Sequence, residues 1–234
     1  MLRKLIRYNA NSYLAGSLAN QLRKQRMSIF EGFFIECFEE QIKKGRRINI
    51  IDLGGDYRFW ESMNFKYIDL VDITLINIIK KDIPCEITNF NSLEGDATNL
   101  CGIRDMEFDL AFSNSCIEHV GGKNEWIKMA REIKRVAPHF FLQTPNYFFP
   151  IEPHFLFPLF QFLPTFLRAF LINRFQLGFW PKGESYNESV KIANEIKLLR
   201  KKDLELLFPD SIIIDERLLG LKKSFMVHDK ISKE

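Results

Sequence analysis

The sequence has few cysteines, and their spacing restricts what they can do. The four cysteines lie far apart along the 234 residues, at Cys37, Cys85, Cys101 and Cys116. Zinc sites and redox-active pairs are usually built from cysteines a few residues apart, as in Cys-x-x-Cys, and no such pair occurs here. The spacing therefore favours unpaired thiols in the reducing cytoplasm, where we expect the protein to be located.

Long apolar runs and a strong net charge are also absent. No stretch of about 18 uninterrupted apolar residues occurs, so we expect no membrane-spanning helix. The apolar run at the start of the sequence is too short for a signal peptide. The formal net charge of +3 is too small to indicate a nucleic-acid partner, and basic and acidic residues are mixed except near Arg3, Lys4 and Arg7.

Phenylalanine, in contrast, is abundant. Hydrophobic residues make up 46% of the chain and charged residues 27%, a balance typical of globular proteins. Of the 23 phenylalanines, nine fall between Phe148 and Phe175, and four prolines interrupt the same segment. Because proline removes a helical hydrogen bond, we expect short, broken helices there.

Strand and helix patterns alternate along the rest of the chain. Residues 12–44 carry apolar side chains at a helical spacing of three to four. Short apolar runs and amphipathic runs then alternate from 48 to 146, which indicates an α/β fold with a mainly parallel sheet. Two strands near the end, 211–217 and 223–229, are too close in sequence to pair in parallel, so we expect them to be antiparallel.

We therefore expect one domain over residues 1–234, divided into four parts. These parts are a helical N-terminal extension (1–45), an α/β core (46–147), an aromatic insertion (148–200), and a closing helix with two strands (201–234). In open parallel sheets, ligands bind beyond the carboxyl ends of the strands. Candidate binding residues are therefore those that follow the strands of the core.

The turn after the first strand holds the first candidates, Gly54, Gly55 and Asp56. The glycines let the backbone approach a ligand closely. Asp56 would repel a pyrophosphate at the helix start and, with the missing G-x-G-x-x-G, argues against a nicotinamide dinucleotide. Two interpretations of Asp56 are compatible: it caps the following helix, or it and Arg58 offer opposite charges to a ligand with an ammonium and a carboxylate.

Two further segments follow neighbouring strands. An acidic or amide residue on the second strand, about 20 places on, commonly holds ribose hydroxyls in such folds. Asp72 lies 20 positions after Asp52 and Asn77 lies 25 after it, so both are candidates for the ribose. In the run Gly95-Asp96-Ala97, the side chain of Asp96 offers a carboxylate for an exocyclic amine.

These segments resemble the class I S-adenosylmethionine-dependent methyltransferases, in the small-molecule group with a methyltransferase-11-like core. The resemblance is carried by IIDLGG, EGDATNL, FDLAFSNSCIEHV, MAREIKRVAPHFFLQTPN and KKDLELLFPDSIIIDERLLGLKKSF, over about residues 46–147 and 201–228. Asp56 and Arg58 replace the family's usual second and third loop glycines, as in a subset with Gly-Gly-x-x-x-Phe-Trp in the first loop and FPIEPHFLFP after the fifth strand. The resemblance implies a Rossmann-like, doubly wound sheet of seven strands, mainly parallel with an antiparallel C-terminal strand.

The resemblance also implies that the core binds S-adenosylmethionine and that the chain is a methyltransferase. The residues assigned to the cofactor are Asp52, Gly54, Gly55 and Asp56 for the methionine part, Asp72 or Asn77 for the ribose, Asp96 and Ala97 for the adenine, and Asn114 for the sulfonium and methyl group.

Glu118 and His119 follow the fourth strand and are the first candidates for chemistry. Methyl transfer to a hydroxyl requires removal of its proton, and a histidine suits that task. His119 is therefore a candidate general base, unless both residues only anchor the loop. In quinone-pathway methyltransferases a Glu-x-x-x-Glu-His run is associated with a metal ion, but Ser115 stands at the first glutamate position, so we expect no metal site.

The aromatic insertion is expected on the acceptor side. It would form a lid over the sheet edge, or alternatively an apolar acceptor pocket or a membrane-surface contact through 155–180, helped by Arg168, Arg174 and Lys182. His154 is a second candidate base, the alternative being a hydrogen-bonded core histidine.

The sequence thus predicts a cytoplasmic methyltransferase, with possible association at the membrane surface. It would use S-adenosylmethionine to methylate a small or lipid-linked acceptor at oxygen, in surface-polysaccharide, lipid or secondary-metabolite biosynthesis. The alternative is a catalytically silent methyltransferase-like domain that serves as a binding or scaffold partner. The identity of the acceptor and the oligomeric state stay open.

Overall fold

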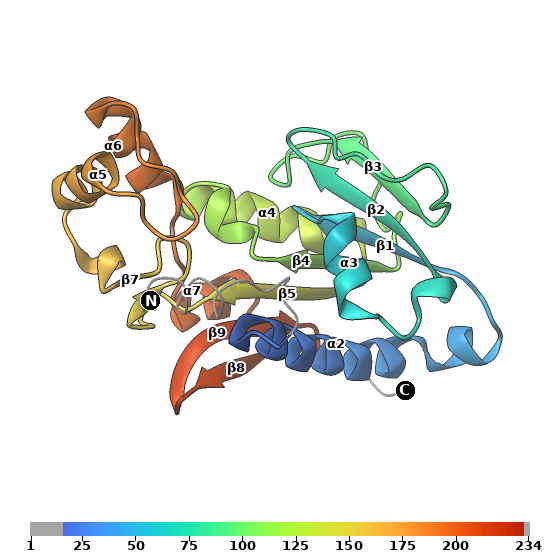
Figure 1. The fold of residues 1–234 in the computed structure, drawn as a ribbon. Helices are drawn as coiled ribbons and strands as arrows, with labels where there is room; N and C mark the ends of the chain where they lie inside the picture. The colour runs from blue at the N-terminus through green and yellow to red at the C-terminus, as the bar shows by residue number, and fades with distance from the viewer. Residues whose placement is uncertain (1–15, 232–234) are drawn as a thin grey trace.

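Seven strands form one sheet in the order β3-β2-β1-β4-β5-β9-β8 in the computed structural model, which describes residues 16–231 (Figure 1). The first five strands pair in parallel, and β9 runs antiparallel to both β5 and β8. Their bounds are β1 (Ile48–Leu53), β2 (Val71–Asn77), β3 (Phe90–Glu94), β4 (Leu110–Asn114), β5 (His139–Pro145), β8 (Ile212–Leu218) and β9 (Leu221–His228). The predicted doubly wound fold is confirmed, with the antiparallel strand near the C-terminus.

Helices cover both faces of this sheet (Figure 1). One face carries α2 (Leu18–Lys43) and α3 (Tyr57–Met63), and the other carries α4 (Lys123–Val136) and α7 (Lys201–Leu207). Short 3-10 turns, η1 (Ile68–Leu70) and η2 (Ile117–His119), precede β2 and α4. The strand order reverses between β1 and β4, so the carboxyl ends of these two strands are where a ligand is expected.

Aromatic side chains attach α2 to the sheet. Phe30, Phe33 and Phe34 recur at the helical spacing and are at most 4% exposed. The ring of Phe30 lies 5.0 Å from that of Phe112 and 5.2 Å from that of Phe141, between centroids. Of the helix predicted over 12–44, residues 12–15 lie outside the described residues, as do the basic residues near the start.

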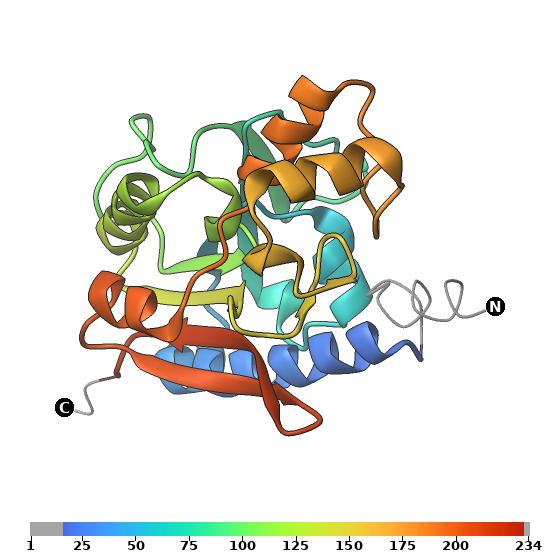
Figure 2. The same ribbon diagram turned by 90° about the vertical axis from the view of Figure 1, so that its left-hand side faces the viewer.

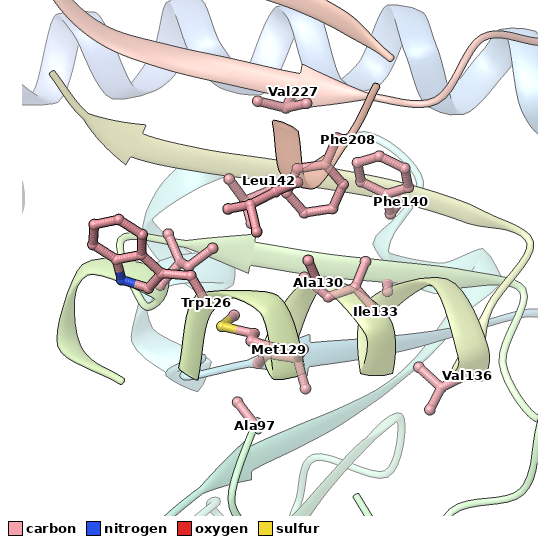
Figure 3. Packing of buried hydrophobic residues seen from close by; sticks show 14 of the residues in the cluster. Ala97, Trp126, Met129, Ala130, Ile133, Val136, Phe140, Leu142, Phe208 and Val227 are labelled. Carbon is pink, nitrogen blue, oxygen red and sulfur yellow. The ribbon is translucent and has the colours of Figure 1, made fainter. Parts of the chain in front are cut away.

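The amphipathic pattern of α4 places its apolar side against the opposite face of the sheet (Figure 3). Met129, Ala130 and Ile133 are almost fully buried there. The ring of Phe140 on β5 stacks on that of Phe208, just beyond α7, with 4.9 Å between their centroids. The closing helix therefore packs beside α4 and completes this side of the core.

The insertion between β5 and α7 forms a small unit of its own (Figure 2). It contains β6 (Ile151–Glu152), β7 (Phe157–Pro158), η3 (Phe160–Phe162), α5 (Thr165–Arg174) and α6 (Tyr186–Glu195). As the prolines predicted, these elements are short, and Pro164 directly precedes α5. The backbone nitrogen of Lys197 donates to the carbonyl of Glu118 at 2.8 Å, which ties the insertion to the loop after β4. Within residues 16–231, no helix combines the length and apolar character that crossing a membrane requires.

The packing of α2 gives a direct prediction for stability. Phe34 is 0% exposed, whereas its neighbour Ile35 is 40% exposed on the same helix. We expect Phe34→Ala to lower the free energy of unfolding by about 3–5 kcal/mol, because it removes a buried ring and leaves a cavity. Ile35→Ala should lower it by less than about 1 kcal/mol. Urea denaturation measures both, and equal losses would contradict the described packing of α2.

Candidate functional site

The loop between β1 and α3 is shaped by two glycines. Gly54 has a backbone φ of +78°, and its nitrogen donates to the carbonyl of Ile76 at 2.8 Å. A Cβ atom at Gly54 would lie 2.7 Å from Cys116 Sγ, and one at Gly55 would lie 2.0 Å from Asp52 Oδ2. Neither position accepts a side chain without rearrangement, so both glycines hold the loop close to the strand ends.

Asp52, one residue before the end of β1, lies almost fully buried beneath this loop. The indole Nε1 of Trp60 donates to its Oδ2 at 2.8 Å. Its other oxygen, Oδ1, is buried and accepts no hydrogen bond from residues 16–231. Burial raises the pKa of Asp52 to about 7, the Trp60 hydrogen bond opposes this shift, and the negative charge of Asp56 adds to it. The carboxyl is thus placed where a cationic group would stabilise its ionised form.

Asp56 caps α3, as one of the two sequence interpretations proposed. Its side chain accepts a hydrogen bond from the backbone nitrogen of Arg58 at 2.8 Å. Asp56 also lines a cavity of about 240 Å³, together with Arg23, Arg26, Asp52, Gly54, Gly55, Phe59, Asn114 and Ser115. Arg58 is exposed and is not among the lining residues. The arginines at this cavity come from α2 instead.

Arg26 is a site residue that the sequence did not reveal. Its Nη1 donates to Asn114 Oδ1 at 2.9 Å, and its Nε lies 3.0 Å from Glu216 Oε1 on β8. It thereby joins α2 to the carboxyl end of β4 and to the far edge of the sheet. Nothing local marks Arg26, because it is one of several basic residues early in α2 and its partners are 88 and 190 positions away.

The two ribose candidates lie at opposite ends of β2. Asn77 is the last residue of the strand, and its Nδ2 donates to the carbonyl of Gly55 at 2.9 Å. Asp72 is the second residue of the strand, and its carboxylate pairs with the guanidinium of Arg47. The structure therefore brings Asn77 to the first loop and leaves Asp72 at the other end of the strand.

Asp96 and Ala97 follow β3 at the same edge of the sheet. The nitrogen of Gly95 donates to the carbonyl of Asn77 at 2.9 Å, which places this turn beside the end of β2. Asp96 is exposed, and its Oδ1 accepts from the backbone nitrogen and the hydroxyl of Thr98, both at 2.8 Å. Ala97 is buried.

The two candidate histidines meet, although 35 residues separate them. His119 Nε2 lies 3.2 Å from His154 Nε2, and their rings are nearly perpendicular at 86°. Glu152 Oε1 lies 2.7 Å from His154 Nδ1, so the carboxylate accepts a hydrogen bond from that nitrogen. The insertion positions this contact, because Glu152 lies in β6 of the insertion. Glu152 Oε2 also accepts hydrogen bonds from the backbone nitrogens of His154 and Phe155.

Glu118 lies close to both histidines and belongs to the same group of side chains. It is 0% exposed, and its Oε2 accepts a hydrogen bond from Thr144 Oγ1 at 2.9 Å. Its Oε1 accepts none from the described part of the chain. One ligand atom each from Glu118, His119 and His154 lies within 4.8 Å of the others. We call these three residues, with Glu152, the histidine centre.

The surroundings shift the pKa values of the two histidines in the histidine centre in opposite directions. His119 is open to solvent on one side, yet desolvation by its dense surroundings lowers its pKa to about 4, and the charge of His154 adds to this. Burial alone would lower the pKa of His154, but the hydrogen bond and charge of Glu152 outweigh it and raise that pKa. Burial also raises the pKa of Glu118.

A second cavity, of about 190 Å³, lies between the insertion and α4. Aromatic side chains form much of its wall, among them Trp126, Tyr147, Phe155 and Phe160. Glu152 lines this cavity and also holds His154, so the histidine centre and the cavity share one side chain.

Comparisons of sequence connect the core to a known domain. Residues 57–138 match the family model of a methyltransferase domain. Two curated relatives, both uncharacterized proteins of Mycobacterium tuberculosis strains, are 36% identical to this chain over 58 residues. The matched part is 25% of this chain and 20% of each relative, so the chain spans about a fifth of the length of the curated relatives it matches.

Solved structures of three methyltransferases are similar to this chain. The CurJ carbon methyltransferase is similar over 92% of this chain and 55% of its own, with a TM-score of 0.54 and 9% identity. Magnesium protoporphyrin IX methyltransferase from Synechocystis PCC 6803, with bound S-adenosylhomocysteine, is similar over 89% of this chain and 84% of its own. The TM-score is 0.48 and the identity is 9%. The 1,6-didemethyltoxoflavin-N1-methyltransferase of Burkholderia thailandensis is similar over 84% of this chain and 77% of its own. The TM-score is 0.46 and the identity is 13%. Residues 57–138 therefore match a methyltransferase domain, and the strand order and the likeness to CurJ show that the chain has the Rossmann-like fold found in class I methyltransferases.

Proposed function

We propose that the chain transfers a methyl group from S-adenosylmethionine to a hydroxyl of a small-molecule acceptor. The observation that carries this proposal is the buried, unpartnered Oδ1 of Asp52, a residue that lines the cavity beneath the first loop. A buried polar atom without a hydrogen bond is costly, and an ammonium group would satisfy it. The methionine part of S-adenosylmethionine carries such a group, so the residues present fit the cofactor.

The remaining contacts of the cofactor are assigned by position along the carboxyl edge. Gly54 and Gly55, which line the cavity, lie against the methionine part, and Asn77 takes the ribose. Asp96 and the backbone of Ala97 take the adenine, and Asn114 lies on the side of the methyl group. When bound, S-adenosylmethionine supplies a methyl group on a positively charged sulfur and leaves as S-adenosylhomocysteine.

The histidine centre supplies the chemistry on the acceptor side. The acceptor hydroxyl must lose its proton to receive a methyl group, and His119 and His154 are the two histidines that stand at this edge of the sheet. The adjoining cavity of about 190 Å³, with aromatic walls, suits an acceptor that is small and partly apolar. Holding the acceptor in line with the methyl group can itself supply much of the rate.

We further propose that the insertion touches a lipid surface, as fits a lipid-linked acceptor in surface-polysaccharide or lipid biosynthesis. Large apolar side chains are exposed over this segment, at Phe162, Phe166, Leu167, Phe170, Phe175 and Phe179. Phe166 and Phe170, on successive turns of α5, are 61% and 56% exposed. Arg174 at the end of α5 and Lys182 are exposed beside them. Exposed aromatic residues flanked by basic ones are typical of peripheral membrane contacts.

Cofactor binding tests the function and the assigned residues. We expect the chain to bind S-adenosylhomocysteine in calorimetry, and Asp96→Ala and Asn77→Ala each to weaken binding about 10- to 100-fold, the cost of a lost hydrogen bond to a ligand. Asp72→Ala should leave the affinity unchanged, because Asp72 lies at the other end of β2. Absence of heat at millimolar cofactor would favour the catalytically silent domain instead.

The buried Asp52 predicts how binding depends on pH. Because its pKa in the free chain is raised to about 7, the carboxyl is largely protonated at pH 6 and must lose a proton to pair with an ammonium. Affinity for S-adenosylhomocysteine should therefore rise from pH 5.5 to about 7 and fall above about 8, where the amino group of the ligand loses its own charge. Calorimetry at pH 6 in buffers of different ionisation enthalpy should detect a released proton.

Asp52→Asn is the matched variant for this pH dependence. Asparagine can still accept the hydrogen bond from Trp60 but cannot ionise. We expect weaker binding with no rise between pH 5.5 and 7. An unchanged rise in this variant would exclude Asp52 as the group that meets the ammonium.

Vesicle flotation tests the membrane contact. The intact chain should float with vesicles that contain phosphatidylglycerol, and the double variant Phe166→Ala with Phe170→Ala should stay at the bottom of the gradient. Leu206→Ala is the control, because Leu206 is 80% exposed but lies on α7. Failure of the intact chain to float would leave the insertion as a lid or pocket wall.

A further inference from the structure

We propose that Glu118, His119 and His154 form a binding site for a divalent transition-metal cation such as Zn²⁺. The sequence indicated no metal site, because Ser115 interrupts the Glu-x-x-x-Glu-His run. The third ligand comes instead from the insertion, which the local run cannot show. The existence of this site rests on the geometry below, and only its catalytic role rests on the proposed methyl transfer.

The spacing of the imidazoles fits two ligands of one ion. Zinc binds histidine nitrogens at 2.0–2.1 Å in tetrahedral sites, so two nitrogens on one zinc lie about 3.3–3.4 Å apart. The two Nε2 atoms are 3.2 Å apart, and the rings are nearly perpendicular rather than stacked. One ligand atom each of Glu118, His119 and His154 lies within 4.8 Å of the other two, so a small movement would bring all three residues to one ion.

The tautomer of His154 is set by Glu152. A carboxylate only accepts hydrogen bonds, so His154 Nδ1 must carry the proton of the bond that Glu152 Oε1 accepts at 2.7 Å. In the neutral ring, Nε2 then presents a lone pair toward His119. Metal-binding histidines almost always donate their other nitrogen to a carboxylate or carbonyl in this way. Glu152 is therefore a positioning residue of the site.

Glu118 provides an independent sign of a ligand. It is 0% exposed, and one of its two oxygens accepts no hydrogen bond within residues 16–231. Its neighbour in the centre, Glu152, is also buried, at 2% exposed. A divalent cation would engage the unpartnered oxygen and balance the two carboxylates.

The ligand set selects the kind of cation. Two imidazoles and one carboxylate suit zinc and similar divalent transition metals, whereas Mg²⁺ and Ca²⁺ prefer oxygen ligands alone. His119 is exposed, so a fourth position faces solvent and is open to water or to an acceptor oxygen. An acceptor hydroxyl bound there would lose its proton to solvent more readily, because the cation stabilises the resulting oxyanion. The two imidazoles then act as ligands of the cation.

Metal binding to the full chain, freed of any affinity tag, tests this site. We expect about one Zn²⁺ per chain by elemental analysis, and visible absorption typical of four- or five-coordinate Co²⁺ after exchange. His119→Ala, His154→Ala and Glu118→Gln should each lower the Zn²⁺ affinity in competition with a chelator by well over tenfold. Glu152→Gln, which removes no ligand, should lower it about 10- to 100-fold. His139→Ala is the control, because His139 pairs with Asp229 outside the centre.

Three results would overturn the proposal. The first is that the chain binds no stoichiometric Zn²⁺ or Co²⁺, the second is that it prefers Mg²⁺ to Zn²⁺, and the third is that His139→Ala loses as much Zn²⁺ affinity as the variants of the centre.

Binding of S-adenosylhomocysteine in the presence of a chelator separates this inference from the proposed function. Cofactor binding without any metal site would reject the cation alone, whereas a metal site without cofactor binding would reject the methyl transfer alone. Because Glu118 is fully buried, the Zn²⁺ affinity of Glu118→Gln is compared only if this variant melts at the same temperature as the unaltered chain. If it does not, His119→Ala and His154→Ala still test the site.

Discussion

The parallel pairing of β1 with β2 and β4 is the constraint on which the rest of the structure depends. Parallel strands end at the same edge, so the residues that follow them come together although the chain separates them widely. The carbonyls of Ile76 and Asn77 receive hydrogen bonds from Gly54 and Gly95, which locks the turns after three strands into one row. Every candidate contact of the cofactor that lies near the first loop depends on this row.

The insertion adds a second layer to the same edge. Its small core supports β6, whose Glu152 holds His154 by a hydrogen bond, and the bond from the nitrogen of Lys197 to the carbonyl of Glu118 fastens the insertion to the loop after β4. The fold thus assembles the histidine centre from two segments, one belonging to the sheet and one to the insertion. Exchanges in the insertion can therefore alter the histidine centre while the residues that follow β1, β2 and β3 are kept.

The sequence predicts what depends on local pattern. Hydrophobic periodicity and strand-end residues were enough for the sheet, for the helices on both faces and for the cap at Asp56. The partners of Asp52 and of Asn114 could not be predicted, because Trp60 and Arg26 are ordinary residues of helices until tertiary packing brings them to the strand ends. The same holds for His119 and His154, which were separate candidates in the sequence and form one contact in the structure. For the ribose, a count of positions allowed Asp72 or Asn77, and the count could not show that the two lie at opposite ends of β2; which of them holds a ribose stays a prediction.

The tight fit between Gly55 and Asp52 restricts which amino-acid exchanges this loop can accept during evolution. A Cβ atom at position 55 would lie 2.0 Å from Asp52 Oδ2, so a larger residue is tolerated there only if the side chain at position 52 is shorter or turned away. Turning it away would break the hydrogen bond from Trp60. Positions 52, 55 and 60 are therefore coupled, and an exchange at one of them is expected to be accepted only together with an exchange at another. The first loop, with its Gly-Gly-x-x-x-Phe-Trp pattern, would then be inherited as a unit rather than residue by residue.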